Sequence, residues 1–76
     1  GVRLNVIITF QETDRDTVLK VLNEEKIKIK RNSSFEYFSP QIEFEIDNSF
    51  SKSLLKVILT KINSLSVDSV EIVRCL

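Results

Sequence analysis

The first ten residues alternate between apolar and polar side chains. Side chains at alternate positions of a strand lie on one face, which here collects four apolar residues: Leu4, Val6, Ile8 and Phe10. The segment is also rich in β-branched residues, which favour strands. Residues 2–10 therefore predict a strand with one buried face.

The pattern then changes from alternation to helical spacing. Thr13 or Asp14 can cap a helix, and the apolar residues that follow recur at intervals of three and four: Val18, Leu19, Val21 and Leu22. We predict a helix from about Asp14 to Glu25.

The middle of the chain predicts further extended segments. Residues 26–31 alternate Lys or Arg with Ile, as in an edge strand or an extended linker, and residues 32–34 should end that run. Residues 35–38 and 41–47 then predict a hairpin around Ser39-Pro40. Its second strand should point Ile42, Phe44 and Ile46 inward, and Glu43, Glu45 and Asp47 toward water. Residues 47–49 form a turn and capping cluster.

The last 26 residues, 51–76, contain neither Gly nor Pro. Placed on a helix at about 100° per residue, their apolar positions cover a sector of roughly 220°. We favour one long helix here, which makes the protein an α+β fold: a three-stranded antiparallel sheet with two helices on one face, in the order βαββα. Such a wide apolar sector exceeds what one small sheet can cover and predicts a binding partner.

A second interpretation ends this helix near Ser64 and makes residues 67–76 a fourth strand. The order then becomes βαββαβ, as in ferredoxin-like folds. Val70 and Ile72 alternate as a strand requires, but Val73 interrupts the pattern, and only Asn63-Ser64 marks a break.

Composition restricts the function. The 76 residues suit one small domain, residues 1–76, and we interpret Gly1, which no Met precedes, as a remnant of expression. There is no His, one Cys, and no Gly beyond position 1, so a histidine base, a Cys-rich metal site and a glycine-rich phosphate loop are excluded. No apolar run is long enough to span a bilayer. We therefore expect a cytoplasmic protein that is not an enzyme and has no catalytic residue, cofactor or metal.

Two charged groups are candidates for chemistry. The acidic Glu43, Glu45 and Asp47 are typical of the solvated face of a strand, and less so of acid–base catalysis or Mg²⁺ binding. The basic group consists of Lys26, Lys28, Lys30 and Arg31, in a chain whose 11 basic and 11 acidic residues balance overall. They can protect a strand edge or contact RNA phosphates.

The aromatic residues and the cysteine have a structural and a functional interpretation each. A base-stacking platform and a hydrophobic core both use aromatic residues, and we favour the core for this set: Phe35, Tyr37, Phe38, Phe44 and Phe50. We expect Cys75 to be a buried structural thiol rather than a reactive one.

Three stretches of the chain resemble one small family. They are residues 4–22, with Leu-x-Val-x-Ile-x-Phe-x-Glu-Thr-x-Arg leading to Val21-Leu22; residues 42–47, with Ile-x-Phe-x-Ile-Asp; and residues 55–76, which contain Asn63-Ser64. This combination resembles the small dimerising subunit of the KEOPS (EKC) tRNA-modification complex, related to the cancer/testis antigens. The segment after Leu22 departs from the Ser-Pro-Asp-like turn of that family, as a divergent paralogue would.

The resemblance implies a non-catalytic scaffold. Such a subunit pairs with a second copy or a paralogue, binds the catalytic ASKHA-fold subunit through its helices, and assists tRNA binding in a complex that makes threonylcarbamoyladenosine. The residues expected at its protein interfaces are Val18, Leu22, Leu54, Leu55, Ile58, Leu59, Ile62, Leu65, Ile72 and Val73. Those that would contact tRNA are Lys26, Lys28, Lys30 and Arg31. A ferredoxin-like regulatory or RNA-binding module is the alternative.

Overall fold

The computed structural model describes residues 1–35 and 38–75, with the backbone alone at Phe35 and Phe38. Its main elements are β1 (Arg3–Thr9), α1 (Arg15–Glu24), β2 (Ile29–Phe35), β3 (Phe38–Asp47), α2 (Ser51–Lys61) and β4 (Val70–Arg74). Short 3₁₀ turns precede α1, α2 and β4, at Glu12–Asp14, Asn48–Phe50 and Val67–Ser69.

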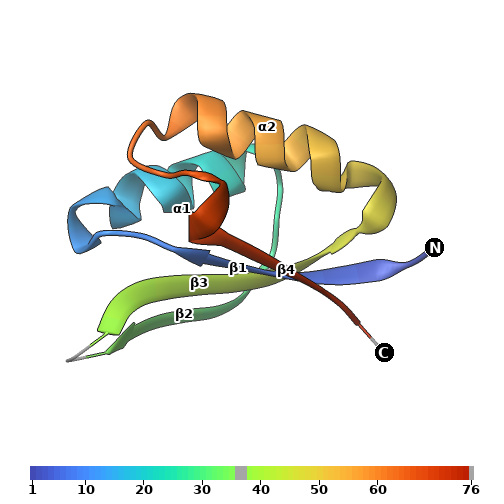
Figure 1. The fold of residues 1–76 in the computed structure, drawn as a ribbon, viewed down its shortest axis with the longest axis horizontal. Coiled ribbons are helices and arrows are strands. Elements are labelled where there is room, and N and C mark those ends of the chain that lie inside the picture. Colours follow the sequence, from blue (N-terminus) through green and yellow to red (C-terminus); the bar gives the residue numbers. More distant parts are fainter. Residues whose placement is uncertain (36–37, 76) are drawn as a thin grey trace.

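The four strands form one antiparallel sheet in the order β2-β3-β1-β4. Both helices lie on the same face of this sheet (Figure 1), and within residues 1–35 and 38–75 no helix covers the other face. The βαββαβ element order with this strand order is the ferredoxin-like arrangement. The α+β class, the antiparallel sheet and the placement of both helices on one face agree with the sequence interpretation.

The predicted long terminal helix is wrong, and with it the three-stranded sheet. α2 ends at Lys61, and Ile62 already has an extended backbone (φ −119°, ψ 92°). The chain turns at Asn63-Ser64, and Ser69 Oγ then accepts a hydrogen bond from the Ser66 N–H (3.2 Å), as in a capping box. The second interpretation is therefore confirmed in having a fourth strand, but β4 is shorter than the expected residues 67–76, because Val67–Ser69 forms a 3₁₀ turn and Leu76 lies outside the described residues. Val73 fits β4 because an edge strand can carry apolar residues on both faces.

Two predictions around the β2–β3 hairpin are also wrong. Asn32, Ser33 and Ser34 do not end a strand but continue β2, and Ser39-Pro40 lies within β3 rather than at the turn. The register between the two strands shifts between Ser33 and Phe35, opposite Pro40. Pro40 also lies opposite Phe10, one residue beyond the end of β1. Its carbonyl accepts a hydrogen bond from the Phe10 N–H (3.1 Å), but proline has no N–H to donate in return.

The predicted caps have a mixed outcome. Asp47 caps the turn before α2, because its carboxylate accepts from the Ser49 N–H (2.9 Å) and hydroxyl (2.7 Å). Asp14 precedes α1 but makes no side-chain cap hydrogen bond, and neither does Thr13, which lies in the 3₁₀ turn. α1 ends at Glu24, and Lys26 then takes a left-handed backbone (φ 58°) that turns the chain toward β2.

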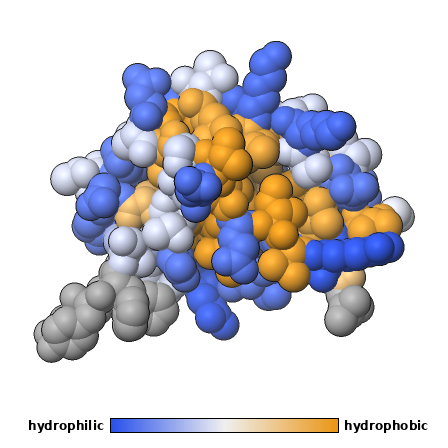
Figure 2. Space-filling view, viewed as in Figure 1, coloured by the Kyte–Doolittle hydropathy of each residue, from blue (hydrophilic) through white to orange (hydrophobic). Residues whose placement is uncertain are grey.

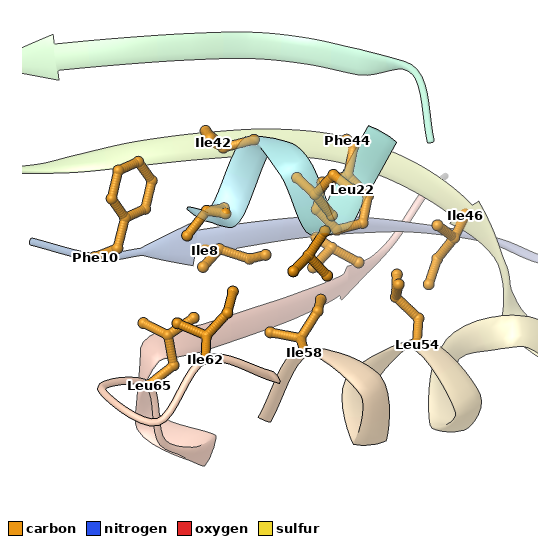
Figure 3. Close-up of a cluster of buried hydrophobic side chains, with 13 residues drawn as sticks. Ile8, Phe10, Leu22, Ile42, Phe44, Ile46, Leu54, Ile58, Ile62 and Leu65 are labelled. Atoms are coloured by element: carbon orange, nitrogen blue, oxygen red, sulfur yellow. The ribbon is translucent and has the colours of Figure 1, made fainter. Parts of the chain in front are cut away.

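The core lies between the sheet and the two helices (Figure 3). The strand patterns placed its sheet side correctly, because Val6, Ile8 and Phe10 of the first segment and the three inward residues of β3 are buried. The buried residues are Val6, Ile8, Phe10, Val18, Val21, Leu22, Ile42, Phe44, Ile46, Leu54, Ile58, Ile62 and Leu65. No polar side chain is buried among the residues that the structure describes.

Candidate functional site

The two edges of the sheet differ in character. At the β2 edge, Lys30 and Arg31 carry exposed cations, Lys28 precedes the strand, and the pairing register shifts twice. Irregular pairing and basic side chains are the usual means by which proteins stop another strand from adding to an edge. The β2 edge is therefore protected, as one interpretation of the basic run predicts.

The β4 edge carries one basic residue, Arg74, and one acidic residue, Glu71, and its pairing is regular. Its register with β1 runs from Leu4 opposite Arg74 to Ile8 opposite Val70 without a shift. Ile72 is 41% exposed and Val73 48% exposed, on opposite faces of the strand. Large apolar side chains on a regular, open edge are typical of a pairing surface.

A shallow apolar groove continues from this edge onto α2. Its floor is formed by side chains that are buried in the core, Val6, Ile46, Leu54 and Ile58, and its accessible sides by Ser51, Leu55, Val70 and Ile72. Figure 2 shows apolar side chains gathered over α2 and the strand in front of it, surrounded by polar ones. We call this groove together with the open edge of β4 the α2–β4 surface.

The α2–β4 surface is uncovered because α2 does not reach across the fourth strand. Ile72 pairs with Val6 and therefore faces the helices, yet Val6 is buried and Ile72 is not. The helix packs through Leu54 and Ile58 onto the inner strands, which leaves Leu55 half-buried above β4. Covering this strip would remove further apolar area from water, which favours association.

The ten residues expected at protein interfaces have three different environments. Six are buried within the chain itself, so the structure does not place them on a docking surface: Val18, Leu22, Leu54, Ile58, Ile62 and Leu65. Leu55 and Leu59 are half-buried, and Ile72 and Val73 are exposed. The amphipathic pattern alone could not make this distinction, because it does not say which apolar side chains meet the sheet.

The four basic residues are all exposed, along the start of β2 and the loop before it. Two of them lie beside one carboxylate, since Lys30 Nζ is 3.9 Å from Glu43 Oε2 and Arg31 Nε is 3.8 Å from Glu43 Oε1. Asn5 Nδ2 also donates to that carboxylate (2.7 Å). Half of the basic group therefore faces a balancing negative charge.

The open face of the sheet offers no aromatic platform in the described part of the chain. The central strands direct Asn5, Ile7, Glu43 and Glu45 to this face, whereas Phe44 points into the core and is fully buried. Base stacking needs aromatic rings on an exposed surface. Phe50 is 37% exposed but lies in the turn before α2 and not on the sheet. The predictions for Phe35, Tyr37 and Phe38 concern side chains that lie outside the described part of the structure.

The acidic stripe and the cysteine show no catalytic arrangement. Hydrogen bonds from the hydroxyl and N–H of Ser49 hold the pKa of Asp47 below its ordinary value. Cys75 donates from Sγ to Glu45 Oε1 (3.1 Å), and this hydrogen bond, with partial burial, raises the pKa of the thiol. A raised pKa keeps the thiol protonated, which makes it a poor nucleophile.

The described residues contain no group of three or more acidic, Cys or His side chains placed to hold a metal ion. Nor does any helix within them have the length and apolar character needed to cross a bilayer. A more polar hollow of about 310 Å³ opens between the end of β1 and the loop before β4, near Asp14 and Asp68. Within this hollow the Ser64 hydroxyl donates to the Asp14 carboxylate (2.7 Å), and the Ser69 hydroxyl accepts from the Ser66 N–H, so these groups already have partners within the chain.

The signal that sequence reasoning missed is the Ser66-Val-Asp-Ser69 segment. A Ser followed three residues later by a side-chain acceptor is typical of the first turn of a helix. Such a start at Ser66 is inconsistent with one continuous helix through residues 51–76. Weighing this pattern with Asn63-Ser64 would have favoured a strand at the C-terminal end and an open edge beside it.

These features define a class: a small ferredoxin-like α+β domain with an apolar groove along one sheet edge. No family model and no curated protein matches the chain. The structure is similar to that of a functionally unknown protein from Pediococcus pentosaceus ATCC 25745, with 9% identity, a TM-score of 0.66, and 99% of this chain and 92% of that chain covered.

Two larger proteins contain the same arrangement. One is PH0061, with 14% identity and a TM-score of 0.59, where 99% of this chain and 52% of that chain are covered. The other is the ligand-free regulatory subunit of aspartate kinase from Thermus thermophilus, with 16% identity, a TM-score of 0.54, and 97% and 53% covered. The chain thus spans about half the length of each. At such low identity these similarities concern the fold alone.

Proposed function

We propose that this chain is a non-catalytic protein-interaction module that acts as a dimerisation and scaffold domain, with the α2–β4 surface as its docking site. The observation that carries the proposal is the difference between the two sheet edges. The β2 edge is charged and irregular, whereas the β4 edge is regular and continues into an apolar groove. A protein that protects one edge and leaves the other open has a use for the open one.

The similarity to a regulatory subunit is compatible with this role, since it concerns a protein whose fold includes the same arrangement. The resemblance to the KEOPS small subunit adds a more specific context: pairing with a second copy or paralogue and binding a catalytic ASKHA-fold subunit. That context rests on the sequence resemblance alone and stays a prediction. The third of its stretches, residues 55–76, here runs through α2, a turn and β4 instead of one helix.

The direct test is association of the purified chain, measured by light scattering over a concentration series. We expect self-association of the wild type and at least about thirty-fold weaker association of Ile72→Glu, because a central apolar interface residue is worth about 2 kcal/mol or more. Phe50→Glu is the matched control, since Phe50 is similarly exposed but lies outside the groove.

Either of two results contradicts the proposal. In the first, the wild type stays monomeric at millimolar concentration and binds no other protein in a way that Ile72→Glu abolishes. In the second, the two substitutions weaken association equally. Circular dichroism of both variants establishes that each is folded.

A further inference from the structure

We infer that the partner at the α2–β4 surface is a second copy of this chain, added antiparallel along β4 with Ile72 on the two-fold axis. This inference rests on the proposed function and specifies its partner and geometry. The two four-stranded sheets would then join into one sheet of eight strands, with all helices on the same side.

The backbone of β4 shows that the partner must supply a strand. Cys75 N–H donates to the Arg3 carbonyl (3.0 Å), and the same register places Val73 opposite Asn5. Because hydrogen-bonded and non-hydrogen-bonded pairs alternate in an antiparallel ladder, Glu71, Val73 and Cys75 direct their backbone groups to β1. The amides and carbonyls of Val70, Ile72 and Arg74 therefore point away from the sheet, and a strand added there would satisfy them.

The even-numbered residues of β1 give independent support for this alternation. Phe10 N–H donates to the carbonyl of Pro40 (3.1 Å), and Asn48 N–H donates to the carbonyl of Val2 (2.8 Å), so these two bonds extend the β1–β3 ladder by one pair at each end. Even positions of β1 thus bond to β3, which leaves the odd positions Arg3, Asn5 and Ile7 for β4.

The side chains of β4 select the register of a self-pair. With Ile72 opposite Ile72 of the second copy, Glu71 lies opposite Val73 and Val70 opposite Arg74, so no like charges meet. Shifting by two residues in one direction puts Glu71 opposite Glu71, which destabilises a sheet. The opposite shift puts Arg74 opposite Ile72 and separates the two grooves. The central register joins the two apolar grooves across the axis without placing like charges opposite one another.

Two properties of the whole chain fit a second copy. Its net charge is zero, with 11 basic and 11 acidic residues, so identical molecules do not repel one another. Pairing through β4 also uses up both open edges, and the edges that remain are the two protected β2 strands. Such an assembly closes as a dimer instead of growing into a fibre.

The test is a disulfide scan in a Cys75→Ser background, with oxidised glutathione as the oxidant and non-reducing electrophoresis as the readout. Ile72→Cys should cross-link into a covalent dimer, because directly opposed residues of a hydrogen-bonded pair have Cα atoms about 5.5 Å apart, within disulfide range. Val73→Cys is the control: it is equally exposed, but the two copies of residue 73 would be offset by two residues, beyond about 7 Å.

The outcomes separate this inference from the function it rests on. Cross-linking of Ile72→Cys well above Val73→Cys supports the self-pair. Preferential cross-linking of Val73→Cys, or of neither in a chain that light scattering shows to be dimeric, overturns the register while leaving the interaction function intact. If the chain is monomeric by light scattering and binds another protein in a way that depends on Ile72, the inference that a second copy occupies the α2–β4 surface is wrong.

Discussion

At the scale of single residues, Arg15 joins the start of α1 to the segment just before it and to β2, whose contacts lie 17 and 19 residues further along the chain. It stands at the first position of α1, pairs with Glu12 (Nε to Oε2, 2.6 Å), and donates to the side chains of Asn32 and Ser34 on β2. Its guanidinium also lies 5.2 Å from the centre of the Phe10 ring. The planar fork of arginine allows these contacts together, and lysine does not.

We therefore expect Arg15→Ala to lower the free energy of unfolding by about 1–2 kcal/mol, and Arg15→Lys to recover less than half of that loss. Urea denaturation followed by circular dichroism measures both variants. Lys20→Ala, on the exposed side of the same helix, should change stability by less than about 0.5 kcal/mol. If Arg15→Ala is as stable as the wild type, the contacts of the Arg15 side chain do not stabilise the fold.

At the scale of elements, the segment between α2 and β4 decides the fold. Ile62 and Leu65 are buried on either side of the Asn63-Ser64 turn, so the chain is anchored to the core just where it leaves the helix. The Ser69 side chain then orders the short turn that begins β4. Both devices act against a continuous helix, and neither is visible in hydrophobic periodicity.

Replacing Ser69 by Ala should loosen β4 without unfolding the domain. One lost hydrogen bond is worth about 0.5–1.5 kcal/mol, so the amides that β4 bonds to β1, those of Glu71 and Val73, should exchange up to about tenfold faster. Amide hydrogen exchange by NMR provides the measurement. The amides of Val6 and Ile8, which face β3, should keep their rates, as should all amides in Ser53→Ala on the exposed side of α2. Uniform acceleration throughout the sheet would instead indicate a global effect.

At the scale of the whole molecule, the charge distribution argues against nucleic acid as the main partner. The chain is neutral overall, and Glu43 faces two of the four residues in the basic group. Electrostatic binding to a phosphate backbone requires cations that release counterions, and a paired cation contributes little.

We expect the isolated chain to bind single-stranded RNA weakly, with a slope of log affinity against log salt of about one or less. Fluorescence anisotropy with a labelled oligonucleotide across a salt series measures it. Glu43→Gln should steepen the slope by freeing Lys30 and Arg31, which makes it an internal positive control. A wild-type slope of three or more would favour the RNA-binding alternative over the interaction module.

The sequence by itself determined the elements whose pattern is local. The alternation in β1 and in the second half of β3 identifies their buried faces, the spacing of Val18, Val21 and Leu22 identifies α1, and residues 47–49 predict the capping turn before α2. These predictions succeed because a period of two or of 3.6 residues follows from the backbone geometry of one element.

The tertiary structure alone decided the end of the chain and the site. Residues 70–74 carry apolar residues on both faces, so their pattern suits a strand and a helix alike, and pairing with β1 settles the choice. The same pairing determines which apolar residues stay outside: Leu54 and Ile58 are buried against the sheet, whereas Ile72, on the edge strand beside α2, stays 41% exposed. Exposure depends on how far a helix extends over a sheet, and that distance is a property of the packed molecule, which no stretch of the sequence contains.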